Sequence, residues 1–159
     1  MIQRIQTLYL LAAAALVGAA MILPLARFAD GVTEYTLNAF AISNSDGETV
    51  QSTIYMGILL SISALLPFVN IFLFRRRMLQ MRLCVMEMVL LAGCAVMIGI
   101  YCWLGMHAVS SLPFSAWSLG IGIVFPLVAI VFVALAARAI FRDELLVRSL
   151  DRIRYSVAL

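Results

Sequence analysis

The chain has 159 residues, of which 65% are hydrophobic and only 12% are charged. Its mean hydropathy is +1.09, so too little polar surface remains to cover a water-soluble globule. The net charge of +3 comes with no pattern of base-reading side chains, and we therefore expect a membrane protein that does not bind nucleic acid.

Four apolar segments match the length of a membrane crossing, for which about 20 helical residues are needed. We predict helices over residues 7–26, 54–74, 83–105 and 115–141. The predicted fold class is an all-α membrane protein, a four-transmembrane-helix bundle with a small extracytoplasmic β-hairpin between helices 1 and 2. All of it forms a single membrane domain, residues 1–159.

The first segment resembles a signal peptide at its charged start, but its apolar stretch exceeds the usual range of about 7–15 residues. We therefore predict a retained helix. The loop 28–53 that follows contains β-branched and aromatic residues and the turn signal Asp46-Gly47, which predict a hairpin over residues 32–53. A lone hairpin is marginal in water. We expect it to pack on the helix ends, or on a partner, through Tyr35, Leu37, Phe40 and Ile42.

Two polar residues near the connection between the second and third helices form a possible intramembrane polar site. An unpaired carboxylate such as Glu87 is costly in a membrane and is a candidate for function. Asn70 lies at a similar predicted depth on the antiparallel neighbour, and nearby Arg side chains could snorkel toward the pair. Two interpretations remain open, a structural clasp between the helices and a proton- or cation-coupled site.

The third helix contains all three cysteines, Cys84, Cys94 and Cys102. Their spacing contains no C-x-x-C, so we interpret them as small packing residues rather than as a redox centre. His107 has no neighbouring ligand residues in the sequence, which favours an interfacial polar residue over a metal site. No cofactor is expected.

Prolines and small residues suggest the packing of the helices. Pro67 and Pro126 fall inside the predicted second and fourth helices, where each would bend its helix. Gly120 and Gly122 predict close helix packing. Beyond the fourth helix, residues 142–154 predict a cytoplasmic amphipathic helix that either lies on the membrane surface or docks a cytosolic partner.

The basic residues give the orientation. All are Arg, and all but Arg27 lie near the termini or between the second and third helices. The positive-inside rule then predicts that both termini are cytoplasmic. The possible cytoplasmic contact or lipid surface consists of Arg75, Arg76, Arg77, Arg82, Arg142, Arg148, Arg152 and Arg154.

Three segments carry a family resemblance: Met1-Ile-Gln-Arg-Ile-Gln-Thr-Leu-Tyr-Leu-Leu, Arg77-Met-Leu-Gln-Met-Arg-Leu-Cys84 and Arg142-Asp-Glu-Leu-Leu-Val-Arg-Ser-Leu-Asp-Arg-Ile-Arg154. They resemble the corresponding segments of the domain of unknown function 4293 family, small four-span membrane proteins of Bacteroidetes. The resemblance covers nearly the whole chain. It implies a bacterial inner-membrane protein and brings no activity with it.

Two function hypotheses follow. The first is a non-enzymatic inner-membrane protein, a scaffold or accessory subunit of an envelope complex, that contacts membrane lipids and either another membrane protein or further copies of itself. The alternative is a small transporter or ligand-binding membrane protein built around Glu87. A membrane enzyme is disfavoured because the sequence shows no nucleophile–base pair, metal cluster or phosphate loop.

Overall fold

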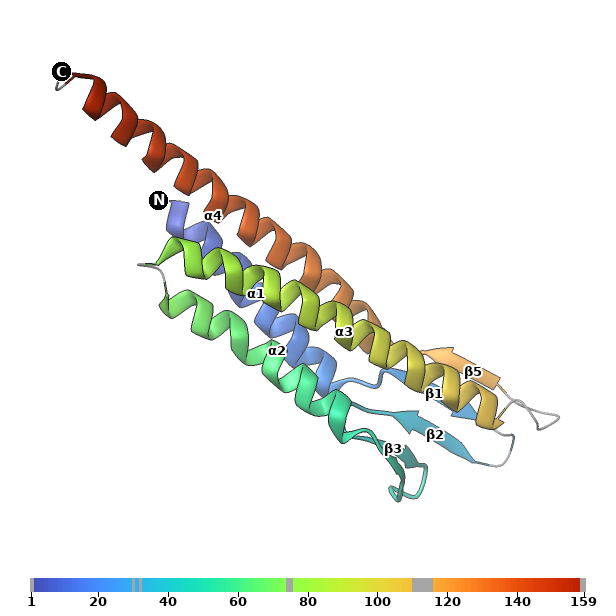
Figure 1. Cartoon of the computed structure of the whole chain (residues 1–159). Coiled ribbons are helices and arrows are strands. Elements are labelled where there is room, and N and C mark those ends of the chain that lie inside the picture. The colour runs from blue at the N-terminus through green and yellow to red at the C-terminus, as the bar shows by residue number, and fades with distance from the viewer. Residues whose placement is uncertain (1, 30, 32, 74–75, 110–115, 158–159) are drawn as a thin grey trace.

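The computed structural model consists of four long helices and, at one end of them, a sheet of short strands (Figure 1). The helices are α1 (Ile2–Ile22), α2 (Ile54–Phe72), α3 (Arg77–Val109) and α4 (Val124–Val157). The structure describes residues 2–29, 31, 33–73, 76–109 and 116–157, without the side chains of 2–4, 77, 108–109 and 147–157. Both termini lie at the end of the bundle opposite the sheet (Figure 1), which we call the terminal end.

The helices form a closed ring in which each packs on two neighbours. α1 contacts α2 and α4, and α3 contacts the same two helices. All four described helices are long and apolar enough to cross a membrane, which confirms the four predicted spans. Their boundaries differ from the prediction, since α1 ends at Ile22 and α3 extends from Arg77 to Val109.

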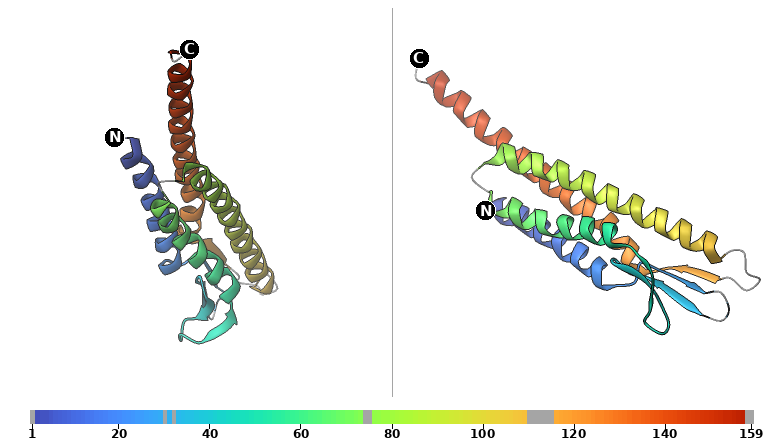
Figure 2. Two further views of the ribbon diagram at one scale, coloured as in Figure 1. Left: turned by 60° about the vertical axis from the view of Figure 1, so that its left-hand side comes forward. Right: turned by 60° about the horizontal axis from the view of Figure 1, so that its bottom comes forward.

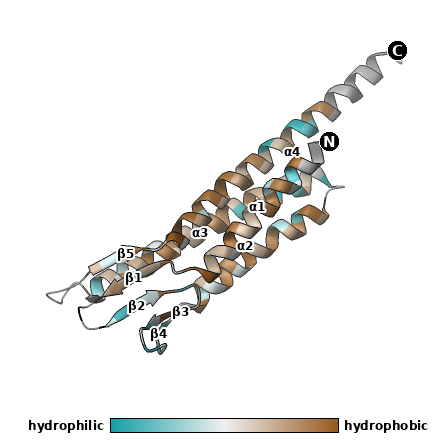
Figure 3. Ribbon diagram, turned by 180° about the vertical axis from the view of Figure 1, so that it is seen from behind, coloured by the Kyte–Doolittle hydropathy of each residue, from teal (hydrophilic) through white to brown (hydrophobic). Residues whose placement is uncertain are grey.

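Each helix buries a single narrow stripe. On α3 the buried residues recur at steps of three or four positions, which is the spacing of left-handed helix packing. They are Gln80, Cys84, Glu87, Leu91, Cys94, Ile98 and Cys102. Most of the other helical residues are apolar, as the brown ribbons of Figure 3 show, and many of them are exposed. An apolar exterior around a narrow core is the pattern expected of helices that face lipid.

The extramembrane part differs from the prediction. Five strands form one antiparallel sheet in the order β4-β3-β2-β1-β5. They are β1 (Ala26–Ala29), β2 (Glu34–Leu37), β3 (Ala41–Asn44), β4 (Thr49–Ser52) and β5 (Ala116–Leu119). The prediction of an all-α protein with a small hairpin between helices 1 and 2 is therefore wrong. β5 comes from the connection between α3 and α4, which the predicted fourth helix had absorbed.

Pro24 and Pro126 lie at the two helix boundaries that differ from the prediction, the end of α1 and the start of α4. The residue before a proline is disfavoured in helical conformation, so Pro24 ends α1 shortly before it and the chain enters β1. Leu25 then donates its backbone N–H to the carbonyl of Leu37, at 2.8 Å, which starts the ladder with β2. After β5, α4 begins only at Val124, so Pro126 lies in its first turn, where no intrahelical hydrogen bond is lost. A proline in the first turn is compatible with a regular helix, so the reason for the predicted bend at Pro126 is removed.

The predicted turn at Asp46-Gly47 is confirmed between β3 and β4. Gly47 has a φ of 81°, a conformation that glycine adopts without strain. Its N–H donates to the carbonyl of Asn44, and the N–H of Asn44 donates to the carbonyl of Glu48, both at 2.9 Å. This turn sets the register of the outer hairpin.

The rings of Phe28 and Phe40 pack against glycines of the helices and hold the strands close to the bundle. A Cβ added at Gly105 of α3 would lie 2.6 Å from the ring of Phe28, and one at Gly57 of α2 would meet the ring of Phe40. Of the residues predicted to pack on the helix ends, Leu37 and Ile42 are buried, Tyr35 is half-buried, and Phe40 is partly exposed but contacts Gly57.

Gly120 and Gly122 serve a backbone contact rather than the predicted contact between helices. A Cβ on Gly120 would collide with the carbonyl oxygen of Pro24, and one on Gly122 would lie 2.9 Å from the same atom. The two glycines let the 3-10 turn Ile121–Ile123 lie directly against the chain that leaves α1.

The predicted C-terminal amphipathic helix, residues 142–154, is the continuation of α4. The helix runs without a break from Val124 to Val157 and extends beyond the other three at the terminal end (Figure 2). A helix lying along the membrane surface would have to turn away from the bundle axis, and the described backbone makes no such turn.

Candidate functional site

The polar residues of the buried stripes gather toward the terminal end of the bundle. Each of the four helices contributes at least one, and none is more than 9% exposed. They are Gln6 of α1, Asn70 of α2, Gln80 and Glu87 of α3, and Asp143 of α4, with Ser63 also buried near the middle of α2. The remaining core toward the sheet is built mainly from small and aliphatic side chains.

On the α2–α3 interface, Asn70 is held on both sides. Its Nδ2 donates a hydrogen bond to Sγ of Cys84 at 3.0 Å. Nε2 of Gln80 donates to the backbone carbonyl of Asn70 at 3.4 Å. Further into the bundle, Oγ of Ser63 lies 3.7 Å from Sγ of Cys94. These contacts link α2 to α3, and the partner of Asn70 is Cys84 rather than Glu87.

Glu87 lies within the core without a hydrogen bond to any described residue. It is 0% exposed, and both of its carboxylate oxygens lack a partner among the described groups, as does Oδ1 of Asn70. No described Arg side chain is hydrogen-bonded to it, so the expected snorkelling contact is not seen in this part of the chain. A buried ionised carboxylate without a partner is strongly destabilising.

The register of the two helices places Glu87 opposite a break in the hydrogen bonding of α2. The contacts of Asn70 with Cys84 and of Ser63 with Cys94 bracket Glu87, so it lies across from the buried Pro67. Pro67 has no N–H to donate, which leaves the backbone carbonyl of Ser63 without its helical donor. The buried carboxyl of Glu87 thus lies at about the depth of Pro67 in α2.

Sequence reasoning missed a second buried pair. Nε2 of Gln6 donates to Oδ2 of Asp143 at 3.0 Å and links α1 to α4. The signal was available, because Gln6 lies at the i−4 position from Leu10 on the apolar stripe of its helix. Asp143 follows Ala136 and Ile140 on the stripe of α4 in the same way.

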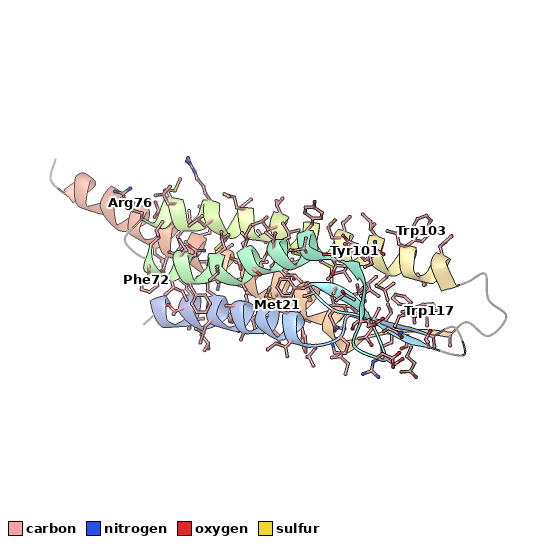
Figure 4. All side chains as sticks on the ribbon, turned by 90° about the horizontal axis from the view of Figure 1, so that it is seen from below. Met21, Phe72, Arg76, Tyr101, Trp103 and Trp117 are labelled. Atoms are coloured by element: carbon pink, nitrogen blue, oxygen red, sulfur yellow. The ribbon has the colours of Figure 1, made fainter. Side chains whose placement is uncertain are left out.

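The predicted arginine surface is only partly described. Arg76, Arg82 and Arg142 are exposed at the terminal end, where Figure 4 shows Arg76 and Phe72. Arg138, which was not in the predicted set, is exposed on the same part of α4. Arg75 lies outside the described residues, and the side chains of Arg77, Arg148, Arg152 and Arg154 lie outside the described side chains.

Aromatic residues mark the opposite end. Trp103 and Trp117 project near the sheet (Figure 4), and Tyr55 is exposed on the first turn of α2. On α3, Arg82 and Trp103 are separated by roughly 31 Å at 1.5 Å per helical residue. That is the thickness of a hydrocarbon core flanked by aromatic and basic anchors.

The cysteines and the histidine show packing contacts. Cys84, Cys94 and Cys102 are free thiols and buried, which fits the interpretation as packing residues. Nδ1 of His107 lies 3.2 Å from the carbonyl of Trp103, and the two rings lie 4.3 Å apart. Among the described residues no group of three His, Cys, Asp or Glu side chains could hold a metal ion.

Four apolar helices of membrane length, a thin buried core and opposed anchor residues together define a multi-pass membrane protein with a sheet outside the spans. The chain matches the family described as Domain of unknown function (DUF4293) over residues 2–153, nearly its whole length. It belongs to this family, as its three motifs indicated. No curated protein matches the chain.

Proposed function

We propose that this protein is a non-enzymatic scaffold or accessory subunit of an envelope complex in the bacterial inner membrane. Its sheet is the contact surface for another membrane or envelope protein. The carrying observation is that both outer strands of the sheet, β4 and β5, are exposed along their whole length. No described strand pairs with the outer edge of either one.

Strand β5 has the features of a contact surface. Trp117 is 58% exposed and Leu119 is 56% exposed, although both lie in a sheet that packs on the helices. Tryptophan is enriched at the energetic centres of protein interfaces. The free N–H and C=O groups of an edge strand can also pair with a strand of a partner.

A shallow depression beside β5 adds polar groups to this surface. It has a volume of about 240 Å³ and is lined by residues of β1, β2 and β5, including Arg27, Glu34 and Trp117. An Arg and a Glu that flank an exposed Trp supply the charged rim and apolar centre typical of protein contacts. This geometry supports recognition of a folded partner.

The proposed orientation places the terminal end in the cytoplasm. The support is the charge asymmetry, with exposed Arg76, Arg82, Arg138 and Arg142 at the terminal end. The sheet then lies on the outer side of the inner membrane. Fusion of a reporter that is active only in the periplasm to residue 46, compared with a fusion at the C-terminus, tests this orientation.

The alternative function, a small transporter or ligand-binding protein built around Glu87, needs a conformation in which water or substrate reaches that carboxyl. The complete burial of Glu87 and Asn70 favours a structural role for both in this conformation. A Glu87→Gln protein that folds and inserts but loses biological function would support the alternative instead.

Photocrosslinking tests the scaffold role at the level of one residue. A photoreactive phenylalanine analogue replaces Trp117 in the full chain in its native membrane, and the control carries it at Val131, which is 57% exposed on α4. We expect one discrete adduct with a second protein at position 117, and lipid adducts at position 131.

Purification in mild detergent then measures stoichiometry. We expect the partner identified by crosslinking to co-purify with the chain, without any crosslinker, in near-equimolar amounts. The Trp117→Ser/Leu119→Ser double variant should no longer retain this partner. A chain recovered alone, under conditions that preserve other membrane complexes, contradicts an accessory subunit.

A further inference from the structure

We infer that the groove between α1 and α4 at the terminal end binds an acidic glycerophospholipid, whose phosphate is held by Arg138 and Arg142. The groove has a volume of about 910 Å³ and is open to the outside of the bundle. Lipid binding in this groove requires insertion in a membrane. It does not depend on the proposed scaffold role, because the groove lies at the end of the bundle opposite the sheet.

The charged part of the groove fits a phosphate group. Arg138 and Arg142 are one turn apart on α4, so their Cβ atoms lie about 6 Å from one another on one face of the helix. Both are exposed, and neither forms an ion pair with a described side chain. Two guanidinium groups at this spacing can each donate hydrogen bonds to the oxygens of one phosphate.

One acidic residue also lines the groove, and it is engaged by the bundle. Asp143 is 9% exposed, and its Oδ2 accepts the hydrogen bond from Gln6. The carboxylate is thereby directed into the α1–α4 interface. The two arginines remain the exposed charges of the lining, so the groove complements an anion.

The rest of the lining is apolar and fits acyl chains. Ile5 and Tyr9 form the α1 wall, and Leu135 and Ala139 form the α4 wall on the side of the membrane centre. A soluble phosphate would gain nothing from these residues. A lipid would bury apolar surface along them, worth about 25 cal/mol per Å².

The depth of the arginines agrees with the headgroup level. Ile121, the first residue of the apolar segment that leads into α4, lies roughly 33 Å from Arg142, at about 2.0 Å per residue in the 3-10 turn and 1.5 Å in α4. That distance is close to the separation of Arg82 from Trp103 on α3. Arg138 and Arg142 therefore lie where lipid phosphates of one leaflet lie, beside a groove that receives the chains.

Native mass spectrometry of the full chain, released from mixed phosphatidylglycerol and phosphatidylcholine nanodiscs, tests the site. We expect retained phosphatidylglycerol in wild type and a loss of about tenfold or more in Arg138→Gln/Arg142→Gln, since each arginine near acidic lipid is worth about 1 kcal/mol. The matched control is Arg76→Gln/Arg82→Gln, which removes the same charge at the same end and should retain the lipid.

A second variant tests the apolar part without changing charge. Ala139→Trp fills the groove and should lower lipid retention while the circular dichroism melting curve stays close to wild type. The Ala139→Trp variant still tests lipid binding if the double arginine variant fails to insert into the membrane. Equal losses in both arginine pairs, equal retention of the two lipids, or displacement by inorganic phosphate alone would each overturn the proposal.

Discussion

Nε2 of Gln6 lies 3.0 Å from Oδ2 of Asp143, so two residues 137 positions apart in the sequence meet inside the bundle. The contact joins the first helix to the last. It lies at the terminal end, while the sheet connects the same two helices at the other end.

Gln6→Leu should therefore destabilise the bundle. Interhelical hydrogen bonds in membrane proteins contribute about 0.6–2 kcal/mol, and we expect a loss in this range. Reversible unfolding in mixed micelles with increasing SDS measures it. A double-mutant cycle with Asp143→Leu isolates the coupling between the two side chains, and a coupling near zero would refute the contact.

Gly120→Ala should disturb the packing of the chain after β5 against the chain that leaves α1. The new Cβ would collide with the backbone carbonyl of Pro24, and a backbone group cannot move aside as a side chain can. Gly99→Ala is the matched control, since its Cβ would have no described atom within 4 Å. We expect a lower melting temperature for the first variant. The control should be neutral or stabilised by up to about 1 kcal/mol. Equal melting temperatures would be the contrary result.

Replacing Glu87 with an apolar residue should stabilise the protein if its carboxyl makes no favourable contact in the core. Glu87→Met removes a polar group that no described residue satisfies and should raise the unfolding free energy by about 1–3 kcal/mol. Leu91→Met, one turn away on the same buried stripe, controls for the introduction of methionine and should be near neutral. A destabilised Glu87→Met variant would show that the carboxyl makes a favourable contact.

The three cysteines should resist a membrane-impermeant maleimide in the native protein and react after denaturation in SDS, because all are buried free thiols. Mass spectrometry counts the adducts. The control is Ser118→Cys on the exposed strand β5, which should react at once. Rapid labelling of native Cys84, which contacts Asn70, would reveal water beside Glu87 and favour the transporter hypothesis.

The number of spans was predictable because hydropathy over about 20 residues is a strong signal for a membrane helix. The turn at Asp46-Gly47 was predictable for a local reason, since glycine accepts the conformation that the turn needs. The burial of Asn70 and Glu87 followed from their positions on the spans, but their partners did not. Whether Asn70 reaches Cys84 or Glu87 depends on a shift of one helical turn between two helices, which no local pattern encodes.

Strand β5 escaped prediction because no charged residue separates it from the apolar segment of α4 that follows. A hydropathy window joins Ala116–Leu119 to the span of α4, and only Gly120 and Gly122 mark the boundary. Strand β1 was hidden similarly at the end of α1, although Pro24 was a usable signal. Their pairing, Ala26 with Leu119, joins segments from distant parts of the chain and is a property of the folded topology.

The position of β5 in the sheet also sets an order for biogenesis. In the orientation that we propose, strands β1 to β4, which follow one another between α1 and α2, can pair as soon as that connection has crossed the membrane. β5 reaches β1 only after the connection between α3 and α4 has crossed as well. Completion of the sheet thus reports that the last helical hairpin has inserted, and a nascent chain arrested before residue 116 would expose the edge of β1 to quality-control proteases.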